Sequence, residues 1–112
     1  MGFERFAVVR VPFPFTDRNS TKNRPAVVLS ESLAFNTPAG HSVMAMITSQ
    51  ANVPWPLDCA LTDLPAAGLP APSVVRFKLF TLDHRLVRGE IGKLSPADEA
   101  SVRAGLAGLL GG

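Results

Sequence analysis

Prolines interrupt this chain of 112 residues so often that long regular elements are excluded from most of it. The breaks fall at residues 12–15, 54–56 and 65–72, and each contains at least two prolines. Proline has no amide hydrogen and also restricts the residue before it, so it ends helices and central strands. Between these breaks lie apolar segments of strand length. The sequence therefore predicts a chain of short strands.

Six segments have the character of strands. Pro25 to Ser30 is a continuous apolar run, which is typical of a buried strand. Ser73 to Leu82 alternates, with Val75, Phe77 and Leu79 on one face and Arg76, Lys78 and Phe80 on the other. The remaining expected strands cover Arg5 to Pro12, Ser42 to Ser49, Cys59 to Leu61 and Leu86 to Ile91. Thr16 to Asn23 and Ser32 to Gly40 are polar or rich in turn residues and are expected to be loops.

The end of the chain predicts a helix. Ser95 is a suitable N-cap, Pro96 suits the first helical position, and Asp98 adds negative charge to the first turn. An apolar stripe at helical spacing follows: Val102, Leu106, Leu109 and Leu110. Residues 1–112 are thus expected to form one domain, mainly β with a C-terminal helix, as a small barrel or curled sheet.

The composition narrows the possible classes of protein. Apolar residues make up 46% and charged residues 18%, which is typical of a globular chain. Cys59 is the only cysteine and there are two histidines, so we expect no internal disulfide, no metal site and no cofactor. No apolar stretch is long enough to cross a bilayer and no signal peptide is evident, which predicts a cytoplasmic protein without a membrane partner. Eight arginines and three lysines permit a polyanionic partner without requiring one.

Five segments, in this order, resemble the PemK/MazF family of toxins. The most specific are residues 9–17, VRVPFPFTD, and residues 24–30, RPAVVLS. Supporting segments are ITSQ at 47–50, PSVVRFKLFTLD at 72–83 and GKLS at 92–95. The resemblance implies a small SH3-like barrel (CcdB/PemK-like) with a C-terminal helix, usually a homodimer. It also implies an mRNA interferase, a metal-independent and sequence-selective endoribonuclease that cuts single-stranded RNA and is held inactive by a cognate antitoxin.

One position departs from the family pattern. Members commonly begin the first strand with glycine followed by an acidic residue, and Phe6-Ala7 stands in that place here. The departure removes a turn glycine and a carboxylate. It bears on the geometry of the first strand and on any role that an acid would play there.

The resemblance assigns two main candidates for chemistry. Arg24 matches the catalytic arginine that precedes the family's proline, and its guanidinium could stabilise charge on the phosphate. Thr48 matches a threonine that the family uses, and Ser49 beside it is a further candidate. Without the resemblance, Arg24 would be interpreted as a surface residue. The two hydroxyls would be interpreted as residues that satisfy backbone groups at a strand end.

Substrate binding is predicted for a second set of residues. Cations and a polar side chain that could contact RNA are Arg18, Lys22, Gln50, Arg76 and Lys78. Trp55 and Phe80 offer possible stacking surfaces, although Trp55 fits a core or partner contact better. For the general base, Asp17 is available, while His41 and His84 fall outside the matching segments and fit solvated loops better.

Two other functions remain open. A non-catalytic SH3-like module could bind an antitoxin and, only through it, operator DNA; the missing glycine–acid pair keeps this alternative open. A DNA gyrase poison on a similar barrel fits less well, because the matching Arg24 and Thr48 would then have no use. The RNA sequence that is cut depends on contacts that the sequence does not fix.

Overall fold

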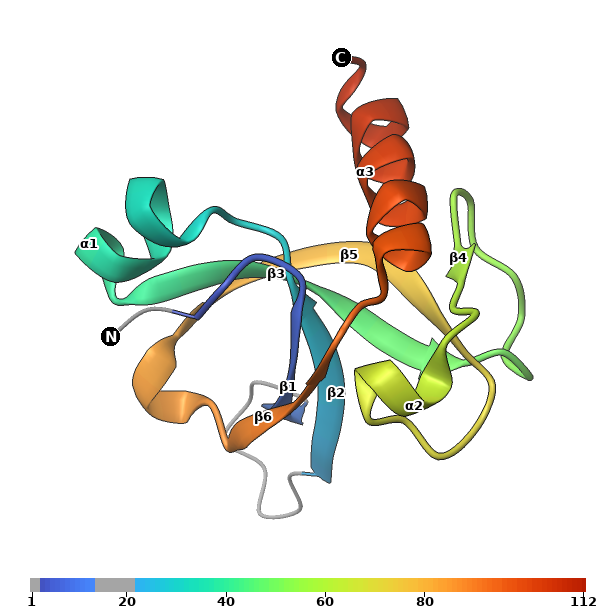
Figure 1. Cartoon of the computed structure of the whole chain (residues 1–112), viewed down its shortest axis with the longest axis horizontal. Coiled ribbons are helices and arrows are strands. Elements are labelled where there is room, and N and C mark those ends of the chain that lie inside the picture. The colour runs from blue at the N-terminus through green and yellow to red at the C-terminus, as the bar shows by residue number, and fades with distance from the viewer. Residues whose placement is uncertain (1–2, 14–21) are drawn as a thin grey trace.

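A computed structural model of the chain describes residues 3–13 and 22–112 (Figure 1). Its strands are β1 (Ala7–Phe13), β2 (Lys22–Val28), β3 (His41–Ser49), β4 (Cys59–Ala60), β5 (Ser73–Asp83) and β6 (Gly89–Lys93). Its helices and helical turns are η1 (Ser32–Asn36), α1 (Thr37–Ala39), α2 (Leu64–Ala67), η2 (His84–Leu86) and α3 (Pro96–Leu110). The predicted mainly β fold with a C-terminal helix is confirmed.

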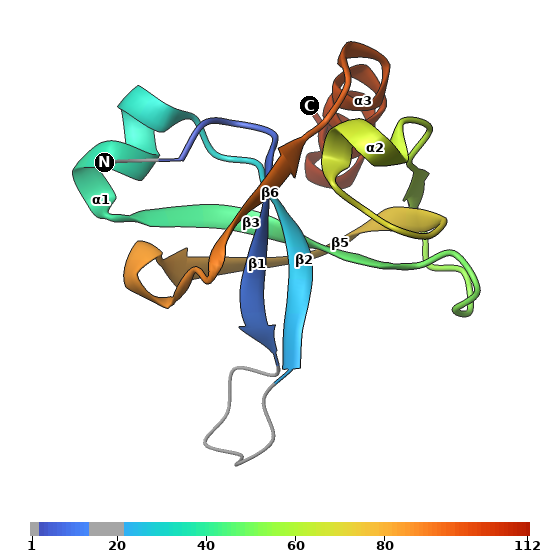
Figure 2. The same cartoon turned by 60° about the horizontal axis from the view of Figure 1, so that its bottom comes forward.

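The strands form one antiparallel, six-stranded sheet in the order β4-β5-β3-β2-β1-β6. The sheet curls strongly, so that β1 and β2 run across the direction of β3 and β5 (Figures 1 and 2). A register shift in β5 adds to the curl: Ala45 pairs with Leu79 while the next residue, Met46, pairs with Arg76. The two extra residues on β5 bend that strand, as bulges do. The result is a half-barrel.

Apolar side chains pack on both faces of this sheet. One cluster contains Val8 and Val27, and the opposite cluster contains Val9, Ala26 and Val28, as alternation along the strands requires. The shift in β5 adds two residues, so the alternation of faces predicted for that strand is kept. Val75 and Phe77 join the first cluster and Phe80 packs against the second, whereas Leu79 is 39% exposed. Leu79 pairs with Ala45 of the first cluster, so it lies on the same face as Val75 and Phe77, in agreement with the sequence prediction.

Four connecting segments differ from the sequence prediction. The last two residues of the loop expected at 16–23 belong to β2, where Lys22 and Asn23 pair with Phe13 and Pro12. The expected loop at 32–40 contains η1 and α1, because the Glu31 carboxylate accepts from the amides of Leu33 and Ala34. The connector at 65–72 begins inside a helix, α2, which Asp63 caps through the amide of Ala66. The strand expected at 86–91 begins later, at residue 89, because Asp83 accepts from the amide of Arg85 and caps the turn η2 first.

Helix α3 starts as predicted and packs closely on β5. The Ser95 hydroxyl accepts from the amide of Asp98, and Pro96 occupies the first turn. Gly105, which weakens the helix on its own, is needed for packing: a Cβ there would lie 2.7 Å from the Phe77 ring. With 15 residues, α3 is the longest helix described. No helix in the described ranges is long and apolar enough to span a membrane.

Phe6 explains how the first strand keeps its geometry without the family's glycine. Its φ is +69°, a left-handed conformation that favours glycine, yet its ring is 1% exposed in the first core cluster. The guanidinium carbons of Arg5 and Arg103 each lie 4.8 Å from the ring centroid. The backbone is held by bonds to Val28 and Leu94. Burial of the ring therefore offsets the backbone strain.

This arrangement predicts an inverted order of stability for two substitutions. Phe6→Ala should lose about 3–5 kcal/mol of unfolding free energy, because it removes the ring and keeps the strain. Phe6→Gly should be more stable than Phe6→Ala by about 1 kcal/mol, because it removes both. Urea unfolding followed by circular dichroism measures the two variants. At an ordinary strand position the alanine variant would be the more stable of the two. That result would contradict the proposed backbone strain at Phe6.

Asp98 anchors the start of α3 to the segment before α2. Its carboxylate is buried and accepts from the amide and hydroxyl of Thr62, at 3.0 and 2.8 Å, and from the amide of Asp63 at 3.1 Å. Burial raises the pKa of this carboxyl, but the hydrogen bonds from Asp63, Thr62 and Ser95 outweigh it. The pKa therefore lies below its ordinary value.

Asp98→Asn is predicted to reduce the free energy of unfolding by about 2–3 kcal/mol at pH 7, because the new NH₂ group faces backbone donors. The carboxylate's stabilisation is fully present above the unfolded pKa of about 3.9 and is lost as pH falls through the lower folded pKa. The difference between wild type and variant should therefore shrink below about pH 4. Urea unfolding at several pH values tests this, with Glu99→Gln in the same helical turn as the control.

Candidate functional site

Alternation along β2 and β3 brings Arg24 and Thr48 to the same face of the sheet. Arg24 precedes Ala26 and Val28 by steps of two, and Thr48 follows Met44 and Met46 in the same way. The inner members of both series are buried in the second cluster or beside it. Arg24 is exposed and Thr48 is half-buried. The buried residues thus fix which face of the sheet Arg24 and Thr48 occupy. Both lie at strand ends, where their polar side chains reach solvent.

A hollow opens where β2 and β3 separate. Their ladder runs through Val28–Met44, Val27–Ala45 and Ala26–Met46 and then ends. Pro25 follows, and proline cannot donate to a ladder. Beyond it the chain forms a shallow pocket of about 240 Å³, lined by Arg24, Met46, Ile47, Thr48, Asn52, Arg76 and Lys78. A second hollow of about 220 Å³ shares Arg24 and Thr48 and reaches Ser49 and the 69–73 segment.

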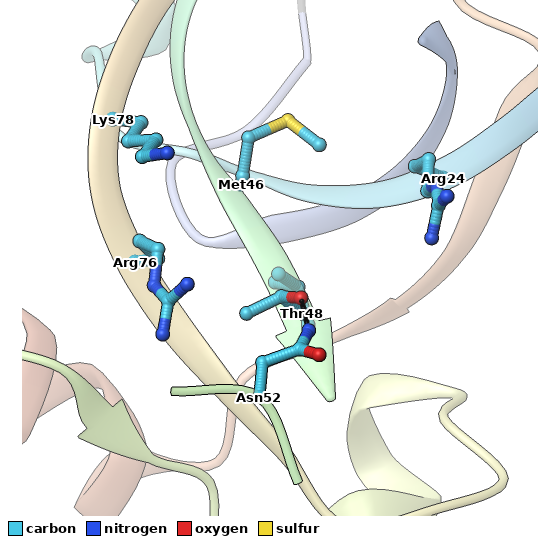
Figure 3. Close-up of a pocket in the computed structure, with 7 residues that line it drawn as sticks. Arg24, Met46, Thr48, Asn52, Arg76 and Lys78 are labelled. Carbon is cyan, nitrogen blue, oxygen red and sulfur yellow. Dashed lines mark hydrogen bonds between the residues drawn. The ribbon is translucent and has the colours of Figure 1, made fainter. Parts of the chain in front are cut away.

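The first pocket, which we call the cationic pocket, carries positive charge on both sides. Figure 3 shows Arg24 on β2 at one side and Arg76 and Lys78 on β5 at the other, with Thr48 on β3 between them. Arg24 forms no hydrogen bond or ion pair with another described residue, so its guanidinium donors can serve a ligand. Among the described residues that line the pocket there is no carboxylate and no histidine. The pocket therefore suits an anion.

Arg76 is fixed in place by Asp58. Its Nε and Nη2 donate to the two carboxylate oxygens of Asp58 at 3.2 and 2.9 Å, and Nη2 also donates to the carbonyl of Val53 at 2.8 Å. The side chains of the pair are 13% and 16% exposed. The hydrogen bond lowers the pKa of Asp58 and raises that of Arg76. Asp58 offsets much of the charge of Arg76, which leaves Arg24 and Lys78 as the pocket's unpaired cations within the described ranges.

Thr48 is oriented by Asn52. The Asn52 side-chain amide donates to Thr48 Oγ1 at 2.6 Å (Figure 3). A hydroxyl that accepts in this way keeps its own proton for another acceptor. Thr48 can therefore donate into the pocket. Sequence reasoning missed Asn52, because a turn must first bring position 52 back to position 48; turn-forming residues after β3 were the available signal.

The other predicted site residues are placed differently. Ser49 lines the second hollow, but its hydroxyl accepts from the amide of Ala51 at 3.2 Å. Gln50 is exposed and lines neither hollow, and Lys22 begins β2, also outside both. Arg18, like the possible base Asp17, lies outside the described residues. The structure thus groups Arg24, Thr48, Arg76 and Lys78, and it leaves Gln50 and Lys22 apart from them.

Both histidines lie away from this pocket. His41 begins β3, and seven residues at about 3.3 Å each separate it from Thr48 by about 23 Å. His84 follows β5 at the same end, where its Nε2 lies 2.7 Å from the Ser42 hydroxyl. Burial and His41 lower the pKa of His84. His84 is thus a partly buried, hydrogen-bonded residue rather than the solvated loop histidine that the sequence suggested.

Among the described residues, no three His, Cys, Asp or Glu side chains come together in a group that could hold a metal ion.

Comparison with known protein families identifies the family of this chain. Residues 4–110 match the family described as the PemK-like, MazF-like toxin of type II toxin–antitoxin systems. This chain belongs to that family. The resemblance drawn from the sequence segments is therefore confirmed over nearly the whole chain.

Solved structures of MazF proteins share the fold. MazF (Form-I) from Deinococcus radiodurans is 24% identical, with a TM-score of 0.75 over 100% of this chain and 99% of that one. A MazE–MazF complex (Form-III) from the same organism is 25% identical, with a TM-score of 0.75 over 99% and 98%. An endoribonuclease in complex with its cognate antitoxin, from Mycobacterial species, is 21% identical, with a TM-score of 0.75 over 98% and 94%. No curated protein sequence matches the chain significantly.

Proposed function

We propose that this MazF-like toxin is a metal-independent, sequence-selective endoribonuclease that cleaves single-stranded RNA. The observation that carries the proposal is the meeting of Arg24 and Thr48 in one cationic pocket with Arg76 and Lys78. Family membership supports it, and relatives of the same fold are described as endoribonucleases. A phosphodiester has the charge and the acceptor oxygens that these side chains suit.

The proposed reaction uses the RNA's own nucleophile. The 2′-hydroxyl oxygen attacks the adjacent phosphorus and forms a new P–O bond, while the bond from phosphorus to the 5′-oxygen breaks. The products are a 2′,3′-cyclic phosphate and a 5′-hydroxyl. One proton leaves the 2′-hydroxyl and one is delivered to the departing 5′-oxygen, so charge and atoms balance.

In this reaction Arg24 and Thr48 stabilise the five-coordinate phosphorus. The Arg24 guanidinium donates to the phosphoryl oxygens as negative charge develops, and the Thr48 hydroxyl, oriented by Asn52, donates to the same group. Lys78 and Arg76 hold the flanking phosphates. The lining residues within the described ranges offer no carboxylate or imidazole. The proton acceptor is therefore water or a side chain outside those ranges, such as Asp17.

We expect Arg24→Ala to lower the cleavage rate by about 10²–10³-fold, because it removes the main charge-stabilising donor. The assay incubates wild type and variant with a long structureless RNA in EDTA and sequences the fragment ends. Discrete cuts with 5′-hydroxyl ends are expected from wild type. Arg88→Ala, which removes an exposed arginine outside the pocket, is the control and should cut normally.

If folded wild-type protein leaves the RNA intact, the alternative function takes precedence. The chain would then be a non-catalytic module that binds an antitoxin and, through it, operator DNA. The absence of the family's carboxylate, where Ala7 stands, favours this alternative. A pull-down with the cognate antitoxin, followed by an operator-binding assay with and without it, would establish that role.

Asn52 is expected to act by positioning Thr48. Asn52→Ala should lower kcat about tenfold and leave KM nearly unchanged, because the hydroxyl loses its orientation and the phosphate contacts remain. In Asn52→Asp the carboxylate can only accept, so Thr48 would donate to it, and the added negative charge should also raise KM. Equal effects of the two variants on kcat and KM would contradict the positioning role.

For partners we propose a cognate antitoxin and a second copy of this chain, in the cytoplasm. Relatives of the same fold have been solved as complexes with antitoxins. Large apolar side chains also remain exposed on this chain, with Leu33 81% and Leu110 70% exposed. Protein contacts would cover such surface. Analytical ultracentrifugation of the chain, alone and with the antitoxin, would give both stoichiometries.

A further inference from the structure

Trp55 lies exposed beside the cationic pocket rather than in the core. It belongs to the segment between β3 and β4 and is 45% exposed. Its backbone amide donates to the Asp58 carboxylate at 2.9 Å, and the same carboxylate holds Arg76. One acidic side chain therefore fixes both the loop that carries the indole and a guanidinium of the pocket. The backbone of Trp55 is thus held in place while its side chain stays exposed beside the pocket.

Two cations of the pocket also lie near the indole ring. The Lys78 ammonium lies 4.6 Å from the ring centroid and the Arg76 guanidinium carbon 5.9 Å from it. Both side chains also line the cationic pocket, so the indole adjoins it. Even with both cations in place, nearly half of the indole residue's surface stays open to solvent. A planar group can therefore reach the ring while its charged neighbour reaches the cations.

We propose that Trp55 is a base-stacking platform for a nucleotide that flanks the scissile phosphate, with Lys78 binding that nucleotide's phosphate. Proteins that bind single strands combine cations along the backbone with aromatic side chains under the bases. The positive surroundings favour a nucleic acid over an uncharged apolar peptide. The inference rests on the proposed RNA substrate, and it adds a subsite that neither Arg24 nor Thr48 provides.

The composition of the chain makes the test direct. Trp55 is the only tryptophan and the chain has no tyrosine, so its fluorescence reports on this site alone. Short 2′-O-methyl RNA homopolymers, which lack the nucleophilic hydroxyl, would be titrated into wild-type protein. An abasic oligomer of the same length supplies phosphates without bases. Base-containing oligomers should quench Trp55 emission, and the abasic oligomer should leave it nearly unchanged.

Affinity supplies the second readout, through the anisotropy of end-labelled oligomers. Trp55→Ala should weaken binding about 5- to 150-fold, the range for the loss of one stacked base, whereas Trp55→Phe should retain part of the affinity. Leu57→Ala is the matched control, because Leu57 is in the same loop and is also 45% exposed. Circular dichroism verifies that each variant is folded.

Three outcomes would contradict the proposal that Trp55 stacks on a base. Oligomers that bind without changing the emission, and bind Trp55→Ala equally well, would refute stacking; cleavage by the wild type would show that the proposed function still stands. Emission that responds to an antitoxin peptide but not to oligomers would make Trp55 a protein contact. If wild type neither binds nor cuts RNA, the proposed function fails and the platform fails with it.

Discussion

The end of the ladder between β2 and β3 is the constraint on which the site depends. Up to Ala26 and Met46 the two strands are held by backbone hydrogen bonds and by the apolar residues on their faces. Pro25 cannot continue this pairing, so the strands separate and their next polar side chains face one hollow. The ladder makes Arg24 and Thr48 neighbours, and its interruption leaves room between them for a ligand.

Much of this arrangement could be predicted from the sequence. Apolar runs located the strands, although β1 and β2 each continue through a proline, Pro12 and Pro25. The resemblance of segments 24–30 and 47–50 singled out Arg24 and Thr48. The pocket's other parts depend on tertiary structure. The two extra residues in β5 and the pairing of Arg76 with Asp58, 18 positions apart, leave no periodic trace in the sequence. The contact of Asn52 with Thr48 likewise exists only once the turn after β3 is formed.

The cations of the pocket differ in whether another side chain already binds them. Arg76 is held by a bidentate bond to a carboxylate and by a bond to a backbone carbonyl. It therefore fixes the loop at 53–58 as well as adding positive charge to the pocket. Arg24 has no partner among the described residues, and the ammonium of Lys78 lies over an indole ring. The anion-binding capacity of the pocket is therefore concentrated in two side chains, on opposite strands, with the Thr48 hydroxyl between them.

The guanidinium groups of Arg5 and Arg103 both lie against the ring of Phe6, which joins the beginning of the chain to its last helix. Where a glycine occupies position 6, the two positive charges would lose the ring that attracts both of them, and only their mutual repulsion would remain. Among related chains, positions 6 and 103 should therefore vary together: an aromatic residue at position 6 should accompany a cation at 103, and a glycine should accompany a neutral or acidic residue. A change at position 6 would then be tolerated best when it is paired with a change at position 103.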